Sequence, residues 1–336
     1  MVPKTLAELG ALLSDLPEAS DEARSGARER QGRLTKPPGS LGRLESLGIW
    51  LAGWQRTVRP EVSAPQVAVF AGEHGVAARG VSAYPPEVTA QMVAGFEAGG
   101  AAINQIARSV GAKLTVHPIA LGRPTADFTQ GPAMTEAEAL DAVRVGMGAL
   151  MPWTDLLVVG EMGIGNTTAA AALCHALFGG APQDWAGRGT GLDEAGVARK
   201  AEAVGAALAA NPEAARDPLA AMAAVGGREL AAMTGAVLEA RLRSVPVVLD
   251  GFIATAAAAV LEVARPGALS HCVAGHLSAE RAHAAALERL RMEPLLSLHL
   301  RLGEGTGAAL AIPLVRAAGA CLSGMATFEE AGVSEG

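Results

Sequence analysis

Five short segments of the sequence combine glycine with a polar side chain just before a predicted helix. Carboxylates in such turns can act as general acids or bases, and glycine-rich turns at helix starts expose backbone N–H groups that bind anions. The segments are AGEHG from residue 71, GEMGIGNTT from 160, DGFIAT from 250, AGHLSAE from 274 and GEGTGA from 303. They predict one polar site that contains Glu73, His74, Glu161, Asp250, Ser278 and Glu304.

The segment from Gly160 to Thr168 has the character of an anion-binding turn. Its glycines leave backbone N–H groups free at the positive end of the following helix, beside hydroxyl and amide side chains. The alternative is a tight turn whose glycines only satisfy the backbone conformation. We favour the anion site because the glycines and the polar side chains coincide.

Two familiar nucleotide motifs do not account for these turns. The Gly160–Thr168 turn lacks the Gly-Lys-Ser/Thr of a P-loop, and Thr168 stands where a dinucleotide fingerprint needs a third Gly or Ala. The segment Gly303–Ala308 fits G-x-G-x-x-A, but no second strand follows it to complete a βαβ unit. The sequence therefore disfavours a nicotinamide-dependent oxidoreductase.

Glu161 and Glu304 are the strongest candidates for acid–base chemistry. Each follows an apolar run inside a glycine-rich turn, although each could instead interact only with a helix dipole. His271 and His276 flank a turn near Cys272, but no third ligand is evident, so a metal site is not predicted.

Apolar runs between helical stretches predict six buried strands of a mostly parallel sheet with helices on both faces. In such a sheet the turns after the strands share one edge, where ligands bind, and this edge would gather the polar residues. The six runs are Gln66–Phe70, Lys113–Ala120, Asp155–Gly160, Val245–Asp250, Leu269–Ala274 and Leu295–Leu300.

The arrangement of helical and strand-like segments predicts a large α/β domain and a smaller helical one. Residues 1–60 precede the first strand and would contribute helices to the small domain. Residues 61–268 would form the large α/β domain. Residues 269–336 would supply the last strands and helices and contribute in part to the small domain, which includes helical material around Ser278 to Leu290.

Composition narrows the class of protein. Half of the 336 residues are apolar and 18% are charged, which is typical of a globular protein with a sizeable core. A net charge of -7 with scattered basic residues argues against a nucleic-acid surface. Three widely spaced cysteines fit reduced thiols in the cytoplasm. The amphipathic N-terminus does not resemble a signal peptide, and the alanine-rich runs are too short to span a membrane.

Several motifs together closely resemble the nicotinate-nucleotide:dimethylbenzimidazole phosphoribosyltransferase family. They are KPPGSLGRLE from residue 36, GEHGVAARGVSAYPPEVTAQMV from 72, GEMGIGNTTAAAAL from 160, GRGTGLD from 187, LDGFIATAAA from 249, GHLSAE from 275 and LRLGEGTGA from 300. The resemblance covers the chain from about Leu34 to about Val315. It implies a Rossmann-like sheet, a small domain built from both chain ends, a homodimer, and no metal or redox cofactor.

The resemblance also implies a reaction and its residues. The phosphoribosyl group would move from nicotinate mononucleotide to 5,6-dimethylbenzimidazole with inversion at C1′, giving α-ribazole 5′-phosphate for cobalamin assembly. Glu304 would be the general base and Glu161 a second catalytic carboxylate. The residues expected to hold the nucleotide are Gly163, Gly165, Asn166, Thr167, Lys200, Asp250 and Ser278. Gln91 would contact the benzimidazole, with Ser82 a weaker candidate.

Two rival functions remain open at this point. One is an oxidoreductase on the same scaffold, which a change in cofactor absorbance would reveal. The other is a non-catalytic nucleotide sensor, for which paired glutamates at the site would be unnecessary. Product formation by the purified protein separates all three.

Overall fold

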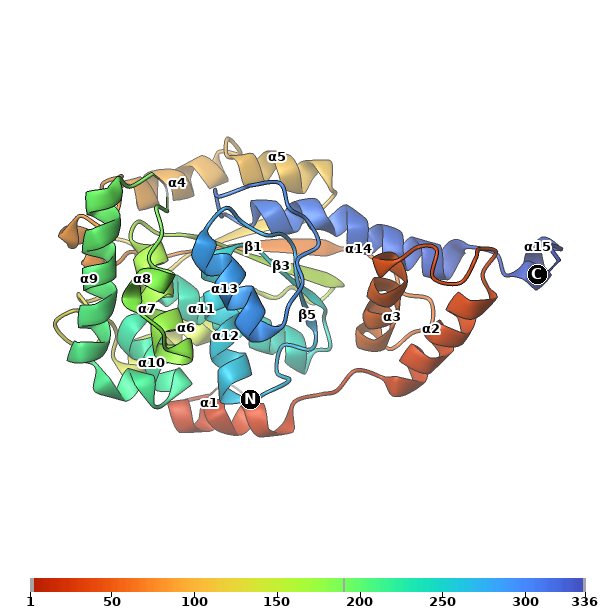
Figure 1. Cartoon of the computed structure of the whole chain (residues 1–336), viewed down its shortest axis with the longest axis horizontal. Coiled ribbons are helices and arrows are strands. Elements are labelled where there is room, and N and C mark those ends of the chain that lie inside the picture. The colour runs from red at the N-terminus through yellow and green to blue at the C-terminus, as the bar shows by residue number, and fades with distance from the viewer. Residues whose placement is uncertain (1–2, 190, 335–336) are drawn as a thin grey trace.

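The structure is a computed structural model that describes residues 3–189 and 191–334. Thr190 of the GRGTGLD motif and the outermost residues of the predicted domains, 1–2 and 335–336, lie outside these ranges. A parallel sheet forms the centre of the molecule and helices surround it (Figure 1).

The sheet has the strand order β2-β1-β3-β4-β5, and every neighbouring pair is parallel. Five of the six predicted strands are confirmed, and β4 and β5 are shorter than predicted. The strands are β1 (Pro65–Ala71), β2 (Lys113–Pro118), β3 (Leu156–Met162), β4 (Val247–Leu249) and β5 (Cys272–Ala274).

The prediction of a sixth strand at Leu295–Leu300 is wrong. This segment runs beside the end of β5, where Leu296 forms one isolated parallel bridge with His276. Pro294 has no N–H to donate, and His299 adopts a left-handed φ of 55°, so a regular ladder cannot extend through the segment. Its alternating leucines resemble a strand, but Leu298 is 53% exposed at the edge of the sheet.

Alternate residues of the strands face two separate apolar cores. Ala68 and Phe70 of β1 belong to one core, whereas Val67 and Val69 belong to the other. This alternation follows from the two-residue period of a strand. Both faces of the sheet are therefore buried, as expected for a parallel sheet.

Different helices cover the two faces of the sheet. Helices α6, α7, α10, α11 and α12 contribute to the core on one face, and α3, α5 and α14 to that on the other. The helices of the first half of the chain are α1 (Leu6–Leu12), α2 (Asp21–Arg33), α3 (Arg43–Gln55), α4 (Val88–Glu97), α5 (Ala102–Ser109), α6 (Glu136–Ala149) and α7 (Asn166–Phe178). The later helices are α8 (Pro182–Trp185), α9 (Glu194–Ala210), α10 (Pro218–Val225), α11 (Arg228–Leu242), α12 (Phe252–Ala264), α13 (Arg281–Leu290), α14 (Thr306–Gly324) and α15 (Phe328–Ala331). Short 3-10 turns occupy Leu13–Asp15, Gly75–Arg79 and Pro212–Ala215.

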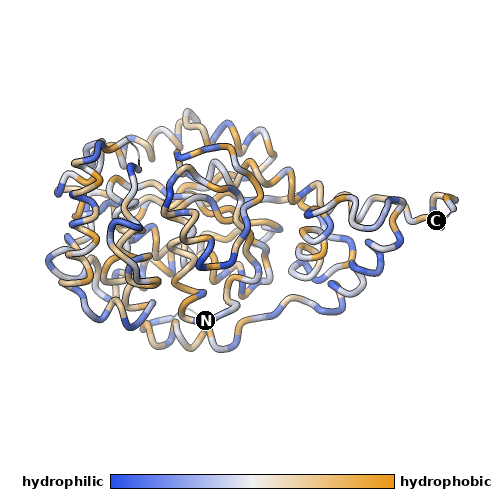
Figure 2. The backbone as a smooth tube through the Cα atoms, in the orientation of Figure 1, coloured by the Kyte–Doolittle hydropathy of each residue, from blue (hydrophilic) through white to orange (hydrophobic). Residues whose placement is uncertain are grey.

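Both ends of the chain contribute to a helical lobe beside the sheet. Figure 1 shows α2 and α3 next to the far part of α14, and Figure 2 shows that hydrophilic residues dominate α2. Ala27, Ala52 and Leu322 form a small core there, and Leu34 makes an antiparallel bridge with Thr327. In contrast, α13 packs against α12 in the main body. The material from Ser278 to Leu290 therefore does not lie in this lobe.

Helix α14 links the lobe to the sheet. Its residues Thr306–Gly324 are long and apolar enough to cross a membrane by length and composition alone. Half of that apolar window is buried inside the protein, where α14 packs against α3, α5 and the strands. The apolar character of α14 is thus that of a core helix.

Candidate active site

Glu161 lies at the carboxyl end of β3 and is buried. The side-chain amide of Asn166 donates a hydrogen bond to Glu161 Oε2, and the backbone N–H of Glu304 donates to Oε1 at 3.3 Å. Burial, reinforced by the negative charge of Asp250, raises the pKa of Glu161 to about 8. Two turns that are far apart in the sequence therefore meet at this carboxyl group.

Glu304 occupies the turn that starts α14. Its φ of 63° is left-handed, between Gly303 at 84° and Gly305 at 85°. A Cβ at Gly160 would lie 2.5 Å from the Glu304 carbonyl, so the close approach of this turn to β3 requires glycine at position 160. A left-handed glutamate costs free energy and is typical of functional sites. Burial, with the charge of Asp250, raises the pKa of Glu304 to about 7.

Asp250 follows β4 and anchors the start of α14. It accepts hydrogen bonds from the backbone N–H groups of Gly305 at 3.1 Å and Ala308 at 2.9 Å, and His276 Nε2 lies 3.4 Å from its Oδ1. Burial by itself would raise the pKa of Asp250, but His276 and these N–H groups outweigh it and lower the pKa. Asp250 is therefore the charged member of the carboxylate group, and its charge favours protonation of Glu161 and Glu304.

The turn Gly163–Thr167 leads directly into α7. Gly165 has a φ of 97°, and a Cβ at Gly163 would lie 2.6 Å from the carbonyl oxygen of Gly72. The backbone N–H of Ile164 donates to Thr89 Oγ1 at 3.0 Å, which holds the turn against α4. The structure thus places the predicted anion turn at the N-terminus of a 13-residue helix.

Lys200 reaches this turn from α9. Its Nζ donates a hydrogen bond to Thr167 Oγ1 at 2.9 Å, and the side chain is buried. Burial lowers the pKa of Lys200 to about 8, although the nearby Glu280 opposes the shift. A cation and a helix N-terminus therefore face the same point.

Ser278 lies on the turn after β5 and is held by His283. The Ser278 N–H donates to His283 Nδ1 at 3.1 Å, and the hydroxyl lies 3.0 Å from the same nitrogen. Because His283 Nε2 is 3.0 Å from Thr255 Oγ1, Ser278 is tied to α12 as well. Burial and the neighbouring His276 lower the pKa of His283 to about 4, so this imidazole is neutral near pH 7.

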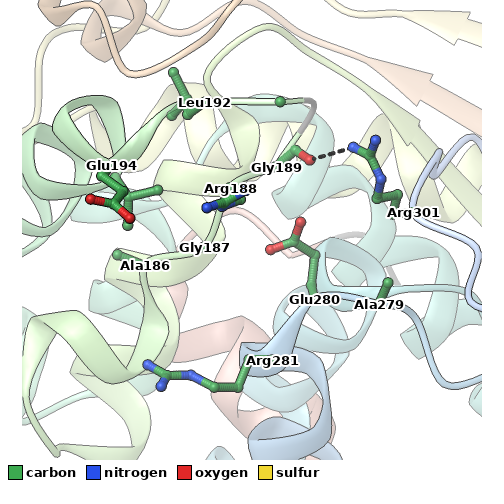
Figure 3. Close-up of a pocket in the computed structure, with 12 residues that line it drawn as sticks. Ala186, Gly187, Arg188, Gly189, Leu192, Glu194, Ala279, Glu280, Arg281 and Arg301 are labelled. Atoms are coloured by element: carbon green, nitrogen blue, oxygen red, sulfur yellow. Dashed lines mark hydrogen bonds between the residues drawn. The ribbon is translucent and has the colours of Figure 1, made fainter.

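Glu161, Ser278 and the Gly163–Thr167 turn line a cavity that adjoins two larger cavities, whereas Asp250 and Lys200 line none of the three. The central cavity is lined by Glu161, Asn166, Thr167, Ser278 and Gly303, together with the start of α12. A cavity of about 600 Å³ adjoins it around Gly187–Gly189 and Glu280 (Figure 3). Another cavity of about 570 Å³ adjoins it on the side of Glu304.

The cavity beside Glu304 has a mostly apolar lining. Its wall includes Met162, Ile164, Arg301 and Leu302, which also line the central cavity. The remaining lining residues are Tyr84, Val88, Met92, His299 and Leu300. The cavity that contains the Gly163–Thr167 turn and a second cavity lined mostly by apolar side chains therefore meet at one wall, with Glu161 on one side and Glu304 on the other.

Two residues expected at the site do not line its cavities, although one of them, His74, packs against the Gly163–Gly165 turn. Glu73 Oε2 accepts a hydrogen bond from the backbone of Gly122 at 2.7 Å, and it lines none of these cavities. His74 is fully buried with its Nε2 2.5 Å from Glu229 Oε1. No local sequence pattern could reveal that pair, because Glu229 begins a helix far along the chain.

The two residues expected to contact an aromatic base are not part of the cavity lining. Gln91 is exposed on α4, although Val88 and Met92 of the same helix line the apolar cavity. Ser82 is half-buried, and its hydroxyl accepts a hydrogen bond from the Tyr84 N–H at 3.3 Å. Their roles in binding stay predictions.

Sequence reasoning missed three contributors to the site. His276 was considered only as a metal ligand, yet it pairs with Asp250. Glu280 and Arg301 line the cavities, and their sequence signal is that Glu280 ends the GHLSAE motif and Arg301 stands in the LRLGEGTGA motif. Over residues 3–189 and 191–334, no group of three His, Cys, Asp or Glu side chains could hold a metal ion.

Comparison with known proteins places the chain in a family. The family model DBI_PRT, described as phosphoribosyltransferase, matches residues 16–333. A nicotinate-nucleotide–dimethylbenzimidazole phosphoribosyltransferase from Jannaschia sp. is 63% identical over 99% of both chains, and one from Ruegeria pomeroyi is 60% identical over 98% of both. The crystal structure of the enzyme of that name from Thermus thermophilus superposes with a TM-score of 0.87 at 45% identity, covering 94% of this chain and 100% of that one. This chain therefore belongs to the DBI_PRT family of phosphoribosyltransferases.

Proposed function

We propose that this enzyme transfers the 5-phosphoribosyl group of nicotinate mononucleotide to 5,6-dimethylbenzimidazole, with inversion at C1′. The products are α-ribazole 5′-phosphate and nicotinate, and the reaction assembles the nucleotide of cobalamin. The observation that carries the proposal is the wall shared by the cavity of the Gly163–Thr167 turn and the cavity lined by Tyr84, Val88 and Met92, with Glu161 and Glu304 on its two sides. The substrates named by the full-length relatives match these two spaces.

The polar side of the wall suits the nucleotide. Lys200 and the N–H groups of the Gly163–Thr167 turn would bind the 5′-phosphate, because a point cation and a helix N-terminus both stabilise a dianion. Asn166 would support the same turn. Asp250 and Ser278 lie toward the ribose, where Asp250 acts by fixing the Glu304 turn.

The apolar side of the wall suits the acceptor base. Benzimidazole attacks C1′ through its unprotonated ring nitrogen, and the product becomes neutral when the other nitrogen loses its proton. Glu304 is the better base of the two glutamates, because its pKa of about 7 leaves a fraction ionised at neutral pH. Glu161, with a pKa of about 8, is mostly protonated there and would act on the ribose side.

The arrangement of two cavities also explains inversion. Nicotinate leaves readily because its ring nitrogen is positively charged in the mononucleotide, so departure needs little acid catalysis. If the acceptor occupies the apolar cavity, it approaches C1′ from the face opposite the leaving group, and a β-nucleotide becomes an α-nucleotide. Holding both rings against one ribose would supply much of the rate acceleration.

The remaining sequence feature in favour of an oxidoreductase is Gly303–Ala308, and its structure does not suit a dinucleotide. A pyrophosphate bound there would need the free N–H groups at the start of α14. Asp250 already accepts hydrogen bonds from Gly305 and Ala308, so this helix start is filled by a carboxylate. The turn is thus an anchoring site for Glu304.

The proposal extends to the assembly and its location. We expect a cytoplasmic homodimer, in which the partner covers the mouth of the apolar cavity. Tyr84, Leu298 and Leu302 support this, since they are each more than half exposed at or beside that cavity. The division of the chain at residues 60 and 268 stays a prediction.

The test is product formation by the purified protein. Nicotinate mononucleotide and 5,6-dimethylbenzimidazole should yield a product with the mass of ribazole phosphate and the α configuration at C1′, measured by mass spectrometry and NMR. A β product would contradict the proposed inversion at C1′. Absence of product with a folded protein would contradict the proposed function.

A further inference from the structure

Glu280 extends between the central cavity and the adjoining cavity of about 600 Å³. It lines both spaces, and Figure 3 shows its carboxylate directed toward the Gly187–Gly189 turn. A Cβ at Gly187 would lie 2.1 Å from Glu280 Oε2, so the carboxylate rests against the backbone of that turn. Glu280 precedes α13 as its N-cap residue, but its side chain makes no capping hydrogen bond. Its position therefore has no explanation in helix stability.

The surroundings of the Glu280 carboxylate are those of a bound anion. The backbone of Gly189 and the positive charges of Lys200 and Arg301 act to lower its pKa. These groups are adjacent to one another: a Cβ at Gly189 would lie 3.3 Å from Lys200 Nζ, and Arg301 donates to the Gly189 carbonyl at 3.2 Å. A glycine N–H, a lysine and an arginine are the donors that a phosphate group requires.

Cations predominate among the charged groups that face Glu280. Lys200 and the exposed Glu194 come from α9, and Arg188 from the turn before it. Arg301 comes from the segment before Glu304, and Arg281 follows Glu280 in α13. Burial raises the pKa of Glu280, while Lys200, Gly189 and Arg301 lower it in part.

We propose that the Glu280 carboxylate occupies part of the anion site in the free protein and is displaced by the phosphate of the incoming nucleotide. The proposal rests on the proposed function, because it takes the Lys200 site as the phosphate site. A buried lysine with no negative charge nearby would be costly, and the charge of Glu280, which is not close enough for an ion pair, favours protonated Lys200 until substrate binds. The phosphate must then overcome this carboxylate, so ribose and base contacts are needed for tight binding. Glu280 would therefore weaken the binding of nucleotide and free phosphate alike, so that only a ligand with ribose and base contacts binds tightly.

The direct test is the Glu280→Gln variant, which keeps the size of the side chain and removes its charge. Binding of nicotinate mononucleotide and of inorganic phosphate is measured by calorimetry without acceptor base. At pH 7, where Lys200 with its pKa of about 8 is still protonated, we expect both ligands to bind about tenfold more tightly to Glu280→Gln, the factor that corresponds to one pKa unit of interaction. The matched control is Glu194→Gln, which removes a carboxylate from the same cavity at an exposed position. It should change binding by less than about twofold.

The pH dependence provides a second readout with a defined sign. Above its pKa the Glu280 carboxylate is charged and competes with phosphate, and below its pKa it is neutral and resembles glutamine. The ratio of the wild-type to the Glu280→Gln dissociation constant should therefore fall toward one as pH falls. Because the ratio compares two proteins with the same ligand, ionisation of the phosphate itself cancels.

Unchanged or weaker ligand binding by Glu280→Gln would overturn the proposal and make Glu280 a ribose ligand or a structural residue. Glu280→Asp is a second variant in case Glu280→Gln misfolds. It keeps the charge on a shorter side chain, so we expect its ligand binding to lie between that of wild type and that of Glu280→Gln. An Asp variant that binds less tightly than wild type would also overturn it. Failure of the proposed function is separate, because it appears as missing α-ribazole phosphate in wild type while the phosphate-binding arm is measured without turnover.

Discussion

Glu304 combines a left-handed backbone, burial and a raised pKa on one residue. If it takes the azole proton, Glu304→Gln should lower kcat by about 10²–10⁴-fold while the variant stays folded, because glutamine occupies the same space without basicity. Steady-state kinetics and a melting curve on one preparation measure both effects. The control Glu22→Gln changes an exposed carboxylate in the first turn of α2 and should leave kcat unchanged. Near-normal turnover in folded Glu304→Gln would remove Glu304 from the mechanism.

The same residue predicts the pH profile of turnover. A general base works when it is deprotonated, so kcat should rise as pH increases through about 7, the pKa of Glu304. The acidic limb should disappear in whatever activity Glu304→Gln retains. An identical limb in the variant would assign it to another group.

Glu161 predicts how stability depends on pH. Its folded-state pKa of about 8 is above its ordinary value of 4.5, so the folded protein binds this proton more tightly than the unfolded chain. The resulting stability is fully present below about 4.5 and is lost progressively as pH rises from there through about 8. Glu161→Gln resembles the protonated form, so its melting temperature relative to wild type should increase over this window. A difference that does not vary with pH would contradict the raised pKa.

At the scale of elements, the Gly303–Gly305 turn leads into α14 and packs against the end of β3. Gly303→Ala should cost about 1–2 kcal/mol of stability, because φ is left-handed there. It should also lower kcat, since the new Cβ would lie 2.1 Å from Glu161 Oε1 and displace that carboxyl group.

Gly267→Ala is the matched control for this turn. Gly267 has a φ of 88° and nothing within 4 Å of an added Cβ, so it carries the same backbone strain without the contact. Both variants should lose similar stability in melting curves, but only Gly303→Ala should lose activity. Equal activity in the two variants would show that the turn tolerates movement of Glu161.

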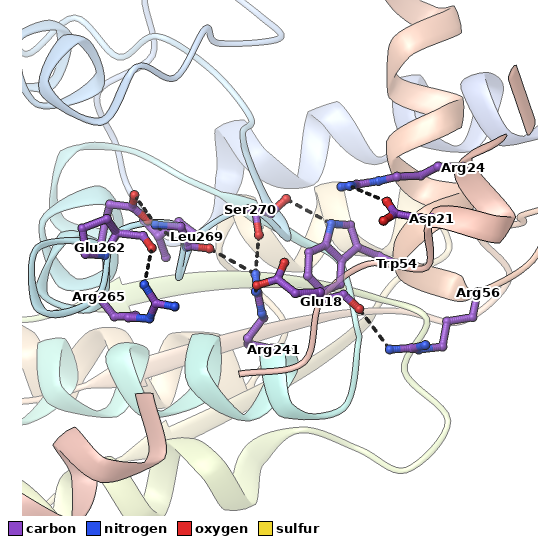
Figure 4. Close-up of polar contacts among 12 residues, drawn as sticks. Glu18, Asp21, Arg24, Trp54, Arg56, Arg241, Glu262, Arg265, Leu269 and Ser270 are labelled. Atoms are coloured by element: carbon purple, nitrogen blue, oxygen red, sulfur yellow. Dashed lines mark hydrogen bonds and ion pairs between the residues drawn. The ribbon is translucent and has the colours of Figure 1, made fainter. Parts of the chain in front are cut away.

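At the scale of the whole molecule, a buried arginine ties the helical lobe to the main body. Figure 4 shows Arg241 of α11 beside Trp54 of α3, and its guanidinium lies 4.5 Å from the ring centroid. Arg241 also bonds to Ser270, whose carbonyl accepts a hydrogen bond from Trp54 Nε1 at 3.0 Å, and it pairs with Glu18 at 3.1 Å. The lobe therefore has a fixed attachment to the amino-end side of the sheet.

The predicted dimer can be tested at the exposed leucine beside the apolar cavity. Leu298→Asp should weaken self-association at least about tenfold, because a charge would be buried in an apolar interface. Light scattering across a concentration series measures this, and the KM of the acceptor base should rise with dissociation. The control is Trp153→Asp, a similarly exposed apolar side chain that precedes the central strand β3, at the amino ends of the strands. A wild-type protein that is monomeric throughout would refute the dimer.

The local features of the site could be predicted from the sequence because they depend on neighbours in the chain. The apolar runs identified β1 to β5, and the glycine-rich segments identified turns whose φ values only glycine adopts readily, such as Gly165 and Gly305. The carboxyl ends of parallel strands share an edge, so the meeting of Glu161 and Asp250 also followed. Glu304 was predicted at the same edge after a sixth strand that does not form, and contacts of its turn with Gly160 and Asp250 bring it there instead.

Only the tertiary structure determines the burial and the electrostatic environment of those residues. Burial and the charge of Asp250 raise the pKa values of Glu161 and Glu304, and no spacing in the chain encodes that environment. The pairing of His74 with Glu229 depends on the sheet order, as does the approach of Glu280 to the Gly187–Gly189 turn. The run Leu295–Leu300 has the pattern of a strand, yet at an edge with one neighbour it forms a single bridge. The sequence pattern indicates which side chains are buried. The neighbours that surround each side chain in the folded protein determine its conformation and its charge.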